Sequence, residues 1–316
     1  MQQFDSSDDL LTTLLKPADG RREVARPAVL SSRAKAEIAR VAALKALRHW
    51  GHMRCSELAR VVYPRALHGE QLAQRLVQRL TERGEVVPRR NALGTRSYVL
   101  SRGGAAALDA MGWEAHHGLE LSSVAGATFI HRSLATRYGV ESELRGYQAF
   151  GEHAIAQGFG PISREALIRH FGKLPDLLLV SKTGAVTWCE VEAASKPLSQ
   201  VQACVRIAEF AGGPLVPFHK LRLERVAFIF DASQGHAQRI ARAAEVQWRA
   251  HPRHERERFA QRIDLVHVEV QPPARWCGAR EVPLWSARPA FGFDIKLIPA
   301  QDRSLARVAK QAFPPT

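Results

Sequence analysis

The stretch that decides the first half of the fold is residues 69–100, GEQLAQRLVQRLTERGEVVPRRNALGTRSYVL. Leucines recur every fourth residue at Leu72, Leu76 and Leu80, which predicts an amphipathic helix that ends at Gly84. Beyond it, residues 85–89 and 97–100 are strand-like and are joined by a turn at 91–94. The sequence therefore predicts a helix followed at once by a hairpin.

Two further helical patterns precede this stretch. One runs from Ser32 to Trp50, and a shorter one follows Arg54 and stops at Tyr63-Pro64. Three helices, the last two closely joined, are typical of a helix-turn-helix, and a basic hairpin behind the third helix is typical of a wing. We therefore expect a winged helix-turn-helix over residues 33–113, closed by a last helix after Ser101.

Charge favours a nucleic-acid partner for this segment. The chain carries 45 Lys and Arg against 31 Asp and Glu, a formal charge of +14, and residues 33–102 hold 15 basic against five acidic residues. Such a balance indicates a polyanionic partner. We expect double-stranded DNA, bound by the solvent-facing side chains of the third helix, Gln71, Gln74, Arg75, Gln78 and Arg79, and by the hairpin residues Arg89, Arg90 and Arg96.

The alternative for this segment is a winged helix that serves protein contacts, with a solvated helical face. Gln and Arg side chains can pair with base edges in the major groove, whereas a solvated face needs no partner. The arginines of residues 238–262, which we expect on one helix, fit a solvated face better than a DNA contact.

Length and composition limit the remaining possibilities. A chain of 316 residues predicts two domains. We expect a flexible arm over residues 1–32, and the absence of basic residues before Leu15 argues against a secretory signal. With no apolar run of about 18 residues, we expect no membrane partner and a cytoplasmic location. The four cysteines show no zinc or redox spacing.

The second half alternates between strand and helix patterns, which predicts an α/β domain over residues 128–271. We expect a helix over residues 134–155, then strands at 176–180 and 186–191, a helix at 201–210, a strand at 226–230, a helix at 237–250 and a strand at 265–270. Residues 272–316 form a Pro-containing extension whose role the sequence leaves open.

Three carboxylates are expected to meet at one end of this sheet. Glu190 and Glu192 are two apart on a strand and project together, and a turn at Thr183-Gly184 brings Asp176 to the same end. Close carboxylates suit Mg²⁺ or Mn²⁺, which can activate water against a phosphodiester. Glu165 could join Asp176 and Glu190 as a metal ligand, and Lys196 could neutralise developing charge. The alternative is that Asp176 caps a turn and both glutamates lie on the exposed face of an edge strand.

This arrangement resembles the PD-(D/E)XK nuclease superfamily. Pro175-Asp176 matches its first element and Glu190-Val191-Glu192 its second, but Glu192 stands at the lysine position. The resemblance implies a restriction-endonuclease-like α/β domain with Asp176, Glu190, Glu192 and Lys196 as its catalytic residues. Some members act with Glu at that position, and many with altered motifs only bind DNA.

The two halves together resemble plasmid replication-relaxation and mobilisation proteins. The shared features are His131, Ser163-Arg164-Glu165 before Asp176, and residues 188–192 before a polar turn. That family is expected to have Asp-Arg where this chain has Glu192-Ala193. The resemblance implies a DNA-binding protein of a plasmid or other mobile element, acting in replication, mobilisation or its regulation, with other such proteins as partners. An active Mg²⁺-dependent endonuclease and a non-catalytic transcriptional regulator remain alternatives, and the oligomeric state stays open.

Overall fold

The computed structural model describes residues 31–118, 128–193, 196–231, 236–271 and 275–283. The chain divides into two units, Met1–Ile38 and Ala39–Thr316, and of the first unit only residues 31–38 are described. Nearly all of the expected arm, residues 1–32, and most of the expected extension, residues 272–316, lie outside the described residues.

Three helices begin the described chain, and they end within two residues of the predicted positions. They are α2 (Ser32–Trp50), α3 (Cys55–Val62) and α4 (Gly69–Glu82). Gly84 terminates α4 because it adopts a φ of +69°, so that the N–H of Glu85 reaches the carbonyl of Leu80 at 2.9 Å. The apolar faces of the three helices share one core, which includes Leu44, Leu58 and Leu76.

The predicted hairpin follows α4. Strands β2 (Val86–Arg90) and β3 (Arg96–Leu100) pair antiparallel, with Arg90 opposite Arg96. A short strand that the sequence did not predict, β1 (His52–Met53), pairs with the other edge of β3 and completes a three-stranded sheet. Helix α5 (Arg102–Asp109) follows, and the Ser101 hydroxyl caps it by accepting from the N–H of Gly104 at 3.0 Å.

The expected helix over residues 134–155 is wrong in its second half. Helix α7 (Thr128–Leu144) ends early, β4 (Gln148–Gly151) follows, and α8 (Glu152–Ala156) comes next. The cause is Gly146, whose φ of +92° lets the N–H of Tyr147 reach the carbonyl of Ser142 at 3.1 Å and so ends the helix. Helix α9 (Arg164–Phe171) then leads to the next strand.

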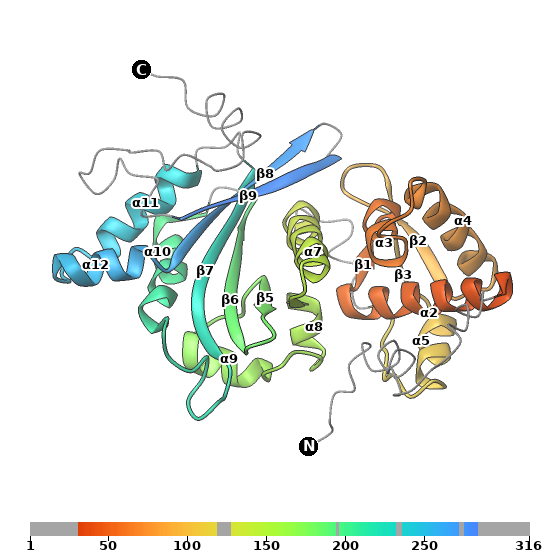
Figure 1. The fold of residues 1–316 in the computed structure, drawn as a ribbon, viewed down its shortest axis with the longest axis horizontal. Coiled ribbons are helices and arrows are strands. Elements are labelled where there is room, and N and C mark those ends of the chain that lie inside the picture. Colours follow the sequence, from red (N-terminus) through yellow and green to blue (C-terminus); the bar gives the residue numbers. More distant parts are fainter. Residues whose placement is uncertain (1–30, 119–127, 194–195, 232–235, 272–274, 284–316) are drawn as a thin grey trace, which may run out of the picture. The chain divides into compact units, whose positions relative to one another are not determined.

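A six-stranded mixed sheet forms the centre of the second half, which confirms the expectation of a central sheet with flanking helices (Figure 1). Its strands lie in the order of the sequence: β4, β5 (Leu177–Val180), β6 (Ala185–Glu192), β7 (Arg222–Asp231), β8 (Ile263–Gln271) and β9 (Arg275–Pro283). The strands β6, β7 and β8 run parallel, and the other neighbours are antiparallel. The sheet therefore extends past the boundary expected at residue 271.

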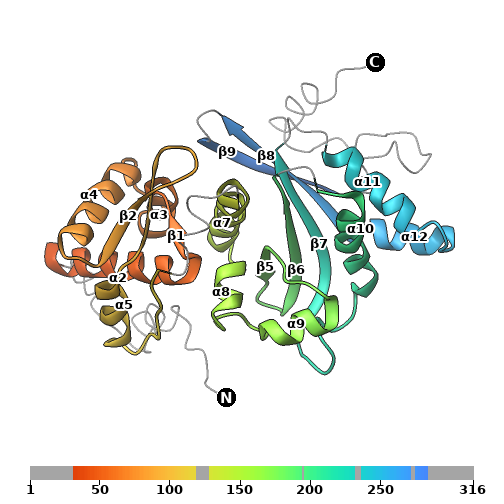
Figure 2. The same ribbon diagram turned by 180° about the vertical axis from the view of Figure 1, so that it is seen from behind.

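Helices cover both faces of this sheet. On one face α7 packs against Leu177, Cys189 and Ile229. On the other face lie α9, α10 (Leu198–Arg206) with the short 3-10 helix η1 (Ile207–Phe210), α11 (His236–Gln247) and α12 (Arg253–Ala260). Figure 2 shows from behind that α10, α11 and α12 lie together on the side away from α7.

The helix expected at residues 237–250 is present as α11, but the arginine-rich stretch over residues 238–262 forms two helices and not one. Helix α11 ends at Gln247, and Pro252 then stands immediately before α12, at a position where its missing N–H is not needed. No helix in the described part of the chain is both long and apolar enough to cross a membrane.

Candidate nucleic-acid interface and carboxylate cluster

Helix α4 has two chemically distinct faces. Its buried residues include Ala73, Leu76, Val77 and Leu80, which lie in the core of the helical segment. All five side chains expected to contact DNA are exposed: Gln71, Gln74, Arg75, Gln78 and Arg79. The leucine spacing thus leaves a continuous polar face, and one of its members, Gln78, donates to the Glu82 carboxylate at 3.1 Å.

The hairpin is held by a buried asparagine. The Asn91 side-chain oxygen accepts from the N–H groups of Leu93 and Thr95, both at 3.1 Å, and its amide donates to Thr95 and Ser97. This network fixes the turn between β2 and β3. The three hairpin arginines expected at the interface, Arg89, Arg90 and Arg96, are all exposed.

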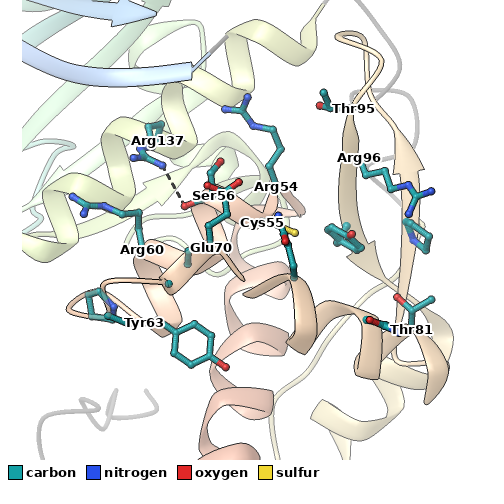
Figure 3. A pocket seen from close by; sticks show the side chains of 18 of the residues that line it. Arg54, Cys55, Ser56, Arg60, Tyr63, Glu70, Thr81, Thr95, Arg96 and Arg137 are labelled. Atoms are coloured by element: carbon teal, nitrogen blue, oxygen red, sulfur yellow. Dashed lines mark hydrogen bonds between the residues drawn. The ribbon is translucent and has the colours of Figure 1, made fainter. Parts of the chain in front are cut away.

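A groove of about 1130 Å³ lies between α3, α4 and the hairpin. Figure 3 shows Arg54 and Arg60 on the α3 side of this groove and Arg96 on the hairpin side. Gln74 and Gln78 of α4 line it, and it also holds residues that sequence reasoning did not select: Arg54, Arg60, Tyr63, Tyr98 and Arg137. The polar face of α4 therefore borders a concave surface whose lining includes four arginines and two glutamates, Glu70 and Glu82.

A buried carboxylate links α3 to α7 beside this groove. Glu57 is 1% exposed and accepts from the backbone N–H of Arg54 at 2.7 Å, from the Arg54 guanidinium and from the Ser133 hydroxyl at 3.1 Å. Nearer the surface, Arg60 binds Glu141 through two bonds of 3.0 and 2.9 Å. These ion pairs fix the position of α3.

His52 is a buried polar group without hydrogen bonds. Its ring is 2% exposed, stacks on Phe129 with centroids 5.5 Å apart, and neither ring nitrogen has a hydrogen-bond partner among the described residues. Burial lowers the pKa of His52 to about 4, and it does the same to the pKa of His49 and of His153. This region holds its histidines neutral near pH 7.

The Asp176 carboxylate lies at the start of β5, as the sequence predicted. It accepts from the N–H of Val191 at 2.7 Å and from His131 Nε2 at 2.9 Å. Burial alone would raise the pKa of Asp176, but the bond from His131 and the charge of Lys173 outweigh it, so this pKa is lowered. Asp176 therefore stays ionised.

Glu190, on β6, is fully buried. It accepts from the indole Nε1 of Trp188 at 2.6 Å and from the ammonium of Lys173, which also contacts Cys204 Sγ at 3.2 Å. Burial, with the negative charge of Asp176, raises the pKa of Glu190. The charge of Glu190 in turn raises the pKa of Lys173, although burial opposes this effect.

Glu192 is 2% exposed and pairs with a second lysine. Lys196 Nζ donates to Glu192 Oε1 at 3.1 Å and to the carbonyl of Val191 at 3.0 Å. Lys196 therefore lies beside the end of β6. The alternative of exposed glutamates on an edge strand is wrong, because β6 lies between β5 and β7 and both side chains are buried.

Glu165 does not join this cluster. It is exposed in the first turn of α9, and no group of three or more His, Cys, Asp or Glu side chains able to hold a metal ion occurs among the described residues. The carboxylates of Asp176, Glu190 and Glu192 are instead each engaged by His131, Lys173 or Lys196. Each of the three clustered carboxylates thus has a nitrogen partner within the chain.

Comparison of the chain with protein-family models, with curated proteins and with solved structures finds no match. Function is therefore inferred from the α4 surface with its hairpin and from the carboxylate cluster.

Proposed function

We propose that residues 33–113 form a winged helix-turn-helix and that this module binds double-stranded DNA through α4 and the β2–β3 hairpin. The proposal depends mainly on the two faces of α4: the leucine face is buried, and the five Gln and Arg side chains selected from the sequence are exposed. Behind α4, the hairpin adds three exposed arginines on a turn fixed by Asn91.

The chemistry of these side chains suits a duplex. Arg can donate two hydrogen bonds to guanine, and Gln can exchange two with adenine, so a helix that carries both can read base edges in the major groove. The hairpin arginines would neutralise phosphates and so fix the register of the protein on DNA. Arg54 and Arg60 extend the cationic surface along the groove, although each is also paired with a glutamate.

The competing proposal, a winged helix that only assembles with proteins, makes a different prediction for the same side chains. The decisive experiment measures duplex binding by fluorescence anisotropy for the wild-type chain and for the Arg75→Ala, Arg79→Ala, Arg89→Ala, Arg90→Ala variant. We expect at least about a hundredfold loss of affinity, because each bidentate base contact contributes roughly 1–3 kcal/mol.

The matched control is the Arg242→Ala, Arg249→Ala variant, which removes one exposed arginine on α11 and one just after it. Its affinity is compared with that of the Arg75→Ala, Arg79→Ala variant. The two variants lose the same charge, so a difference between them reports position rather than net charge. Equal affinities for both pairs would argue against a dedicated DNA-binding face on α4.

We further propose that residues from 128 onward form a nuclease-like domain of the PD-(D/E)XK type that binds DNA or supports binding without cleaving it. Its support is the β5–β6 hairpin, which carries Asp176 at the start of one strand and Glu190 and Glu192 at the end of the next. The non-catalytic form is favoured because Lys173 and Lys196 already neutralise the two glutamates.

The active alternative is an endonuclease dependent on Mg²⁺, and it is tested by incubating supercoiled plasmid with the chain and Mg²⁺ or Mn²⁺. We expect the plasmid to stay supercoiled. Nicking or linearisation that disappears in both Asp176→Ala and Glu190→Ala would establish the active alternative instead.

The resemblance to plasmid replication-relaxation and mobilisation proteins leads us to infer a role in the replication or mobilisation of a mobile element, or in its regulation. Sequence-specific binding would support this role. A selection of binding sites from random duplexes should return a preferred sequence that depends on Gln74 and Gln78, and enrichment that is the same for the Gln74→Ala, Gln78→Ala variant would contradict it.

A further inference from the structure

The loop before β7 presents one aromatic side chain in an unusual way. Phe218 has a φ of +63° and is fully exposed, and it is the only residue other than glycine with a positive φ in the described part of the chain. The left-handed region is unfavourable for a bulky residue, so a phenylalanine there carries conformational strain. Strain that the fold retains at an exposed position points to a role for the side chain.

The loop itself is well anchored, so this exposure is a feature of the fold. Leu215, Val216 and Leu221 are buried in the core of the sheet. The N–H of Leu215 bonds to the carbonyl of Leu221 at 2.7 Å, and the N–H of His219 to the carbonyl of Val216 at 3.1 Å. Three of the four large apolar side chains of the loop therefore hold it in place, and Phe218 alone projects.

The turn makes the choice of residue specific. Pro217 and Phe218 occupy the second and third positions of the turn closed by His219, and a positive φ at the third position of such a turn usually selects Gly or Asn. Phenylalanine is thus a poor residue for the turn and a good one for a contact, since a rigid ring loses little entropy when it binds.

The surroundings of Phe218 are cationic. Lys220 lies on the same loop, and Arg222 is the first residue of β7. Lys182 lies on the neighbouring turn, where the carbonyl of Gly184 accepts from the N–H of Arg222 at 3.0 Å. All three side chains are exposed. Residues 211–223 and 181–185 contain no acidic residue, and the next residue along β7 is the exposed Glu224. An aromatic ring among exposed cations suits a nucleic acid, because a base can stack on the ring while neighbouring phosphates contact the lysines and the arginine.

We propose that the Phe218 loop is a second nucleic-acid contact, in which the ring stacks on an unpaired nucleobase or enters a base step of a duplex. This contact lies at the end of the sheet where β6 and β7 begin, whereas Glu190 and Glu192 lie at the other end of β6. Phe and other apolar side chains act as wedges between base pairs in some DNA-binding proteins, and aromatic rings hold unpaired bases in others. The inference rests on the proposed function only in requiring that the chain binds DNA.

The test compares Phe218→Asn with Phe218→Tyr in the full chain. Asn tolerates a positive φ, so we expect Phe218→Asn to unfold at the same or a higher temperature while binding DNA about fivefold more weakly or worse. Phe218→Tyr keeps the ring and should keep wild-type affinity. Anisotropy with a labelled single strand and with its duplex distinguishes stacking on an unpaired base from a wedge in a duplex.

Wild-type affinity of Phe218→Asn for both DNA forms would overturn this inference, while a loss of binding on removing Arg75 and Arg79 would still support the proposed function. The reverse pattern, with only Phe218→Asn impaired, would support the Phe218 contact and refute the α4 interface. A Phe218→Asn protein that changes its oligomeric state at unchanged DNA affinity would mean that Phe218 binds another protein chain, which also overturns the inference.

Discussion

The α4 surface and the carboxylate cluster place their charges in opposite ways. On α4 and the hairpin, the arginines and glutamines selected for DNA contact are all exposed to solvent. In the cluster, Glu190 and Glu192 are buried, and each is engaged by a lysine of the same chain. Free surface charge is available to a ligand, whereas paired buried charge mainly serves the fold.

This contrast separates binding from stability. Substitution of the exposed glutamines and arginines of α4 and the hairpin should lower DNA affinity and change the free energy of unfolding little. Buried ion pairs should matter for folding, because removal of one partner leaves an uncompensated charge in a medium of low polarity. A loss of DNA affinity without loss of stability in a cluster variant, or the reverse in an α4 variant, would contradict this division of roles.

The largest expected effect is on stability in the cluster. Lys173→Met removes the ammonium that pairs with the buried Glu190 carboxylate, which then keeps its hydrogen bond from the Trp188 indole. We expect the free energy of unfolding to fall by about 3 kcal/mol. The measurement is urea unfolding at pH 7. Adding Glu190→Gln removes the unpaired charge and keeps the Trp188 bond, so the double variant should recover most of the loss. A single variant as stable as wild type would show that the pair contributes nothing.

The next effect is the pH dependence of the histidine region. Because burial lowers the pKa of His52 to about 4 from about 6.5 in the unfolded chain, the unfolded state binds a proton first as pH falls. The contribution of His52 to the free energy of unfolding is therefore fully present above about pH 6.5. It falls as the pH drops toward 4, by up to about 3 kcal/mol. His49 and His153 add to the same decline.

His52→Phe isolates this contribution. The substitution keeps a ring on Phe129 and loses no hydrogen bond to the described residues, so stability at pH 7.5 should be unchanged or higher. Unfolding monitored between pH 7.5 and pH 4 should then show a shallower decline than in the wild type. An identical pH profile would mean that His52 is not held neutral by burial.

A smaller effect is expected on the hairpin. Arg89→Ala with Arg90→Ala should change stability by less than about 0.5 kcal/mol, because both side chains are exposed. If both contact phosphates, the slope of log affinity against log salt should decrease in magnitude by about 2. The salt series is measured by anisotropy with the same duplex, and an unchanged slope would place these arginines away from the DNA backbone.

How far the sequence predicted these two regions depends on the range of the interactions. The faces of α4 follow from leucines within one helix, and the hairpin from a turn of a few residues, so local spacing was sufficient. The positions of Asp176 and of the two glutamates followed from strand periodicity and a short turn. Each of these features is local in the chain.

The features that were missed depend on contacts distant in sequence. Lys173 carries no motif signal, and its pairing with Glu190 arises only when the loop after α9 meets β6. The bond from His131 to Asp176 joins α7 to β5 in the same way. Strand β4 was overlooked because Gly146 ends α7 inside an apolar pattern that also fits a helix, and Glu165 was placed in the cluster although α9 exposes it.

Hydrogen–deuterium exchange of the intact chain with and without a duplex can show whether α4 and the β2–β3 hairpin contact DNA. We expect DNA to slow exchange in α4 and in the β2–β3 hairpin, while α12 and the strands β5 and β6 keep the same rates. Unchanged exchange in α4 and the hairpin at a DNA concentration that saturates the protein would contradict this expectation.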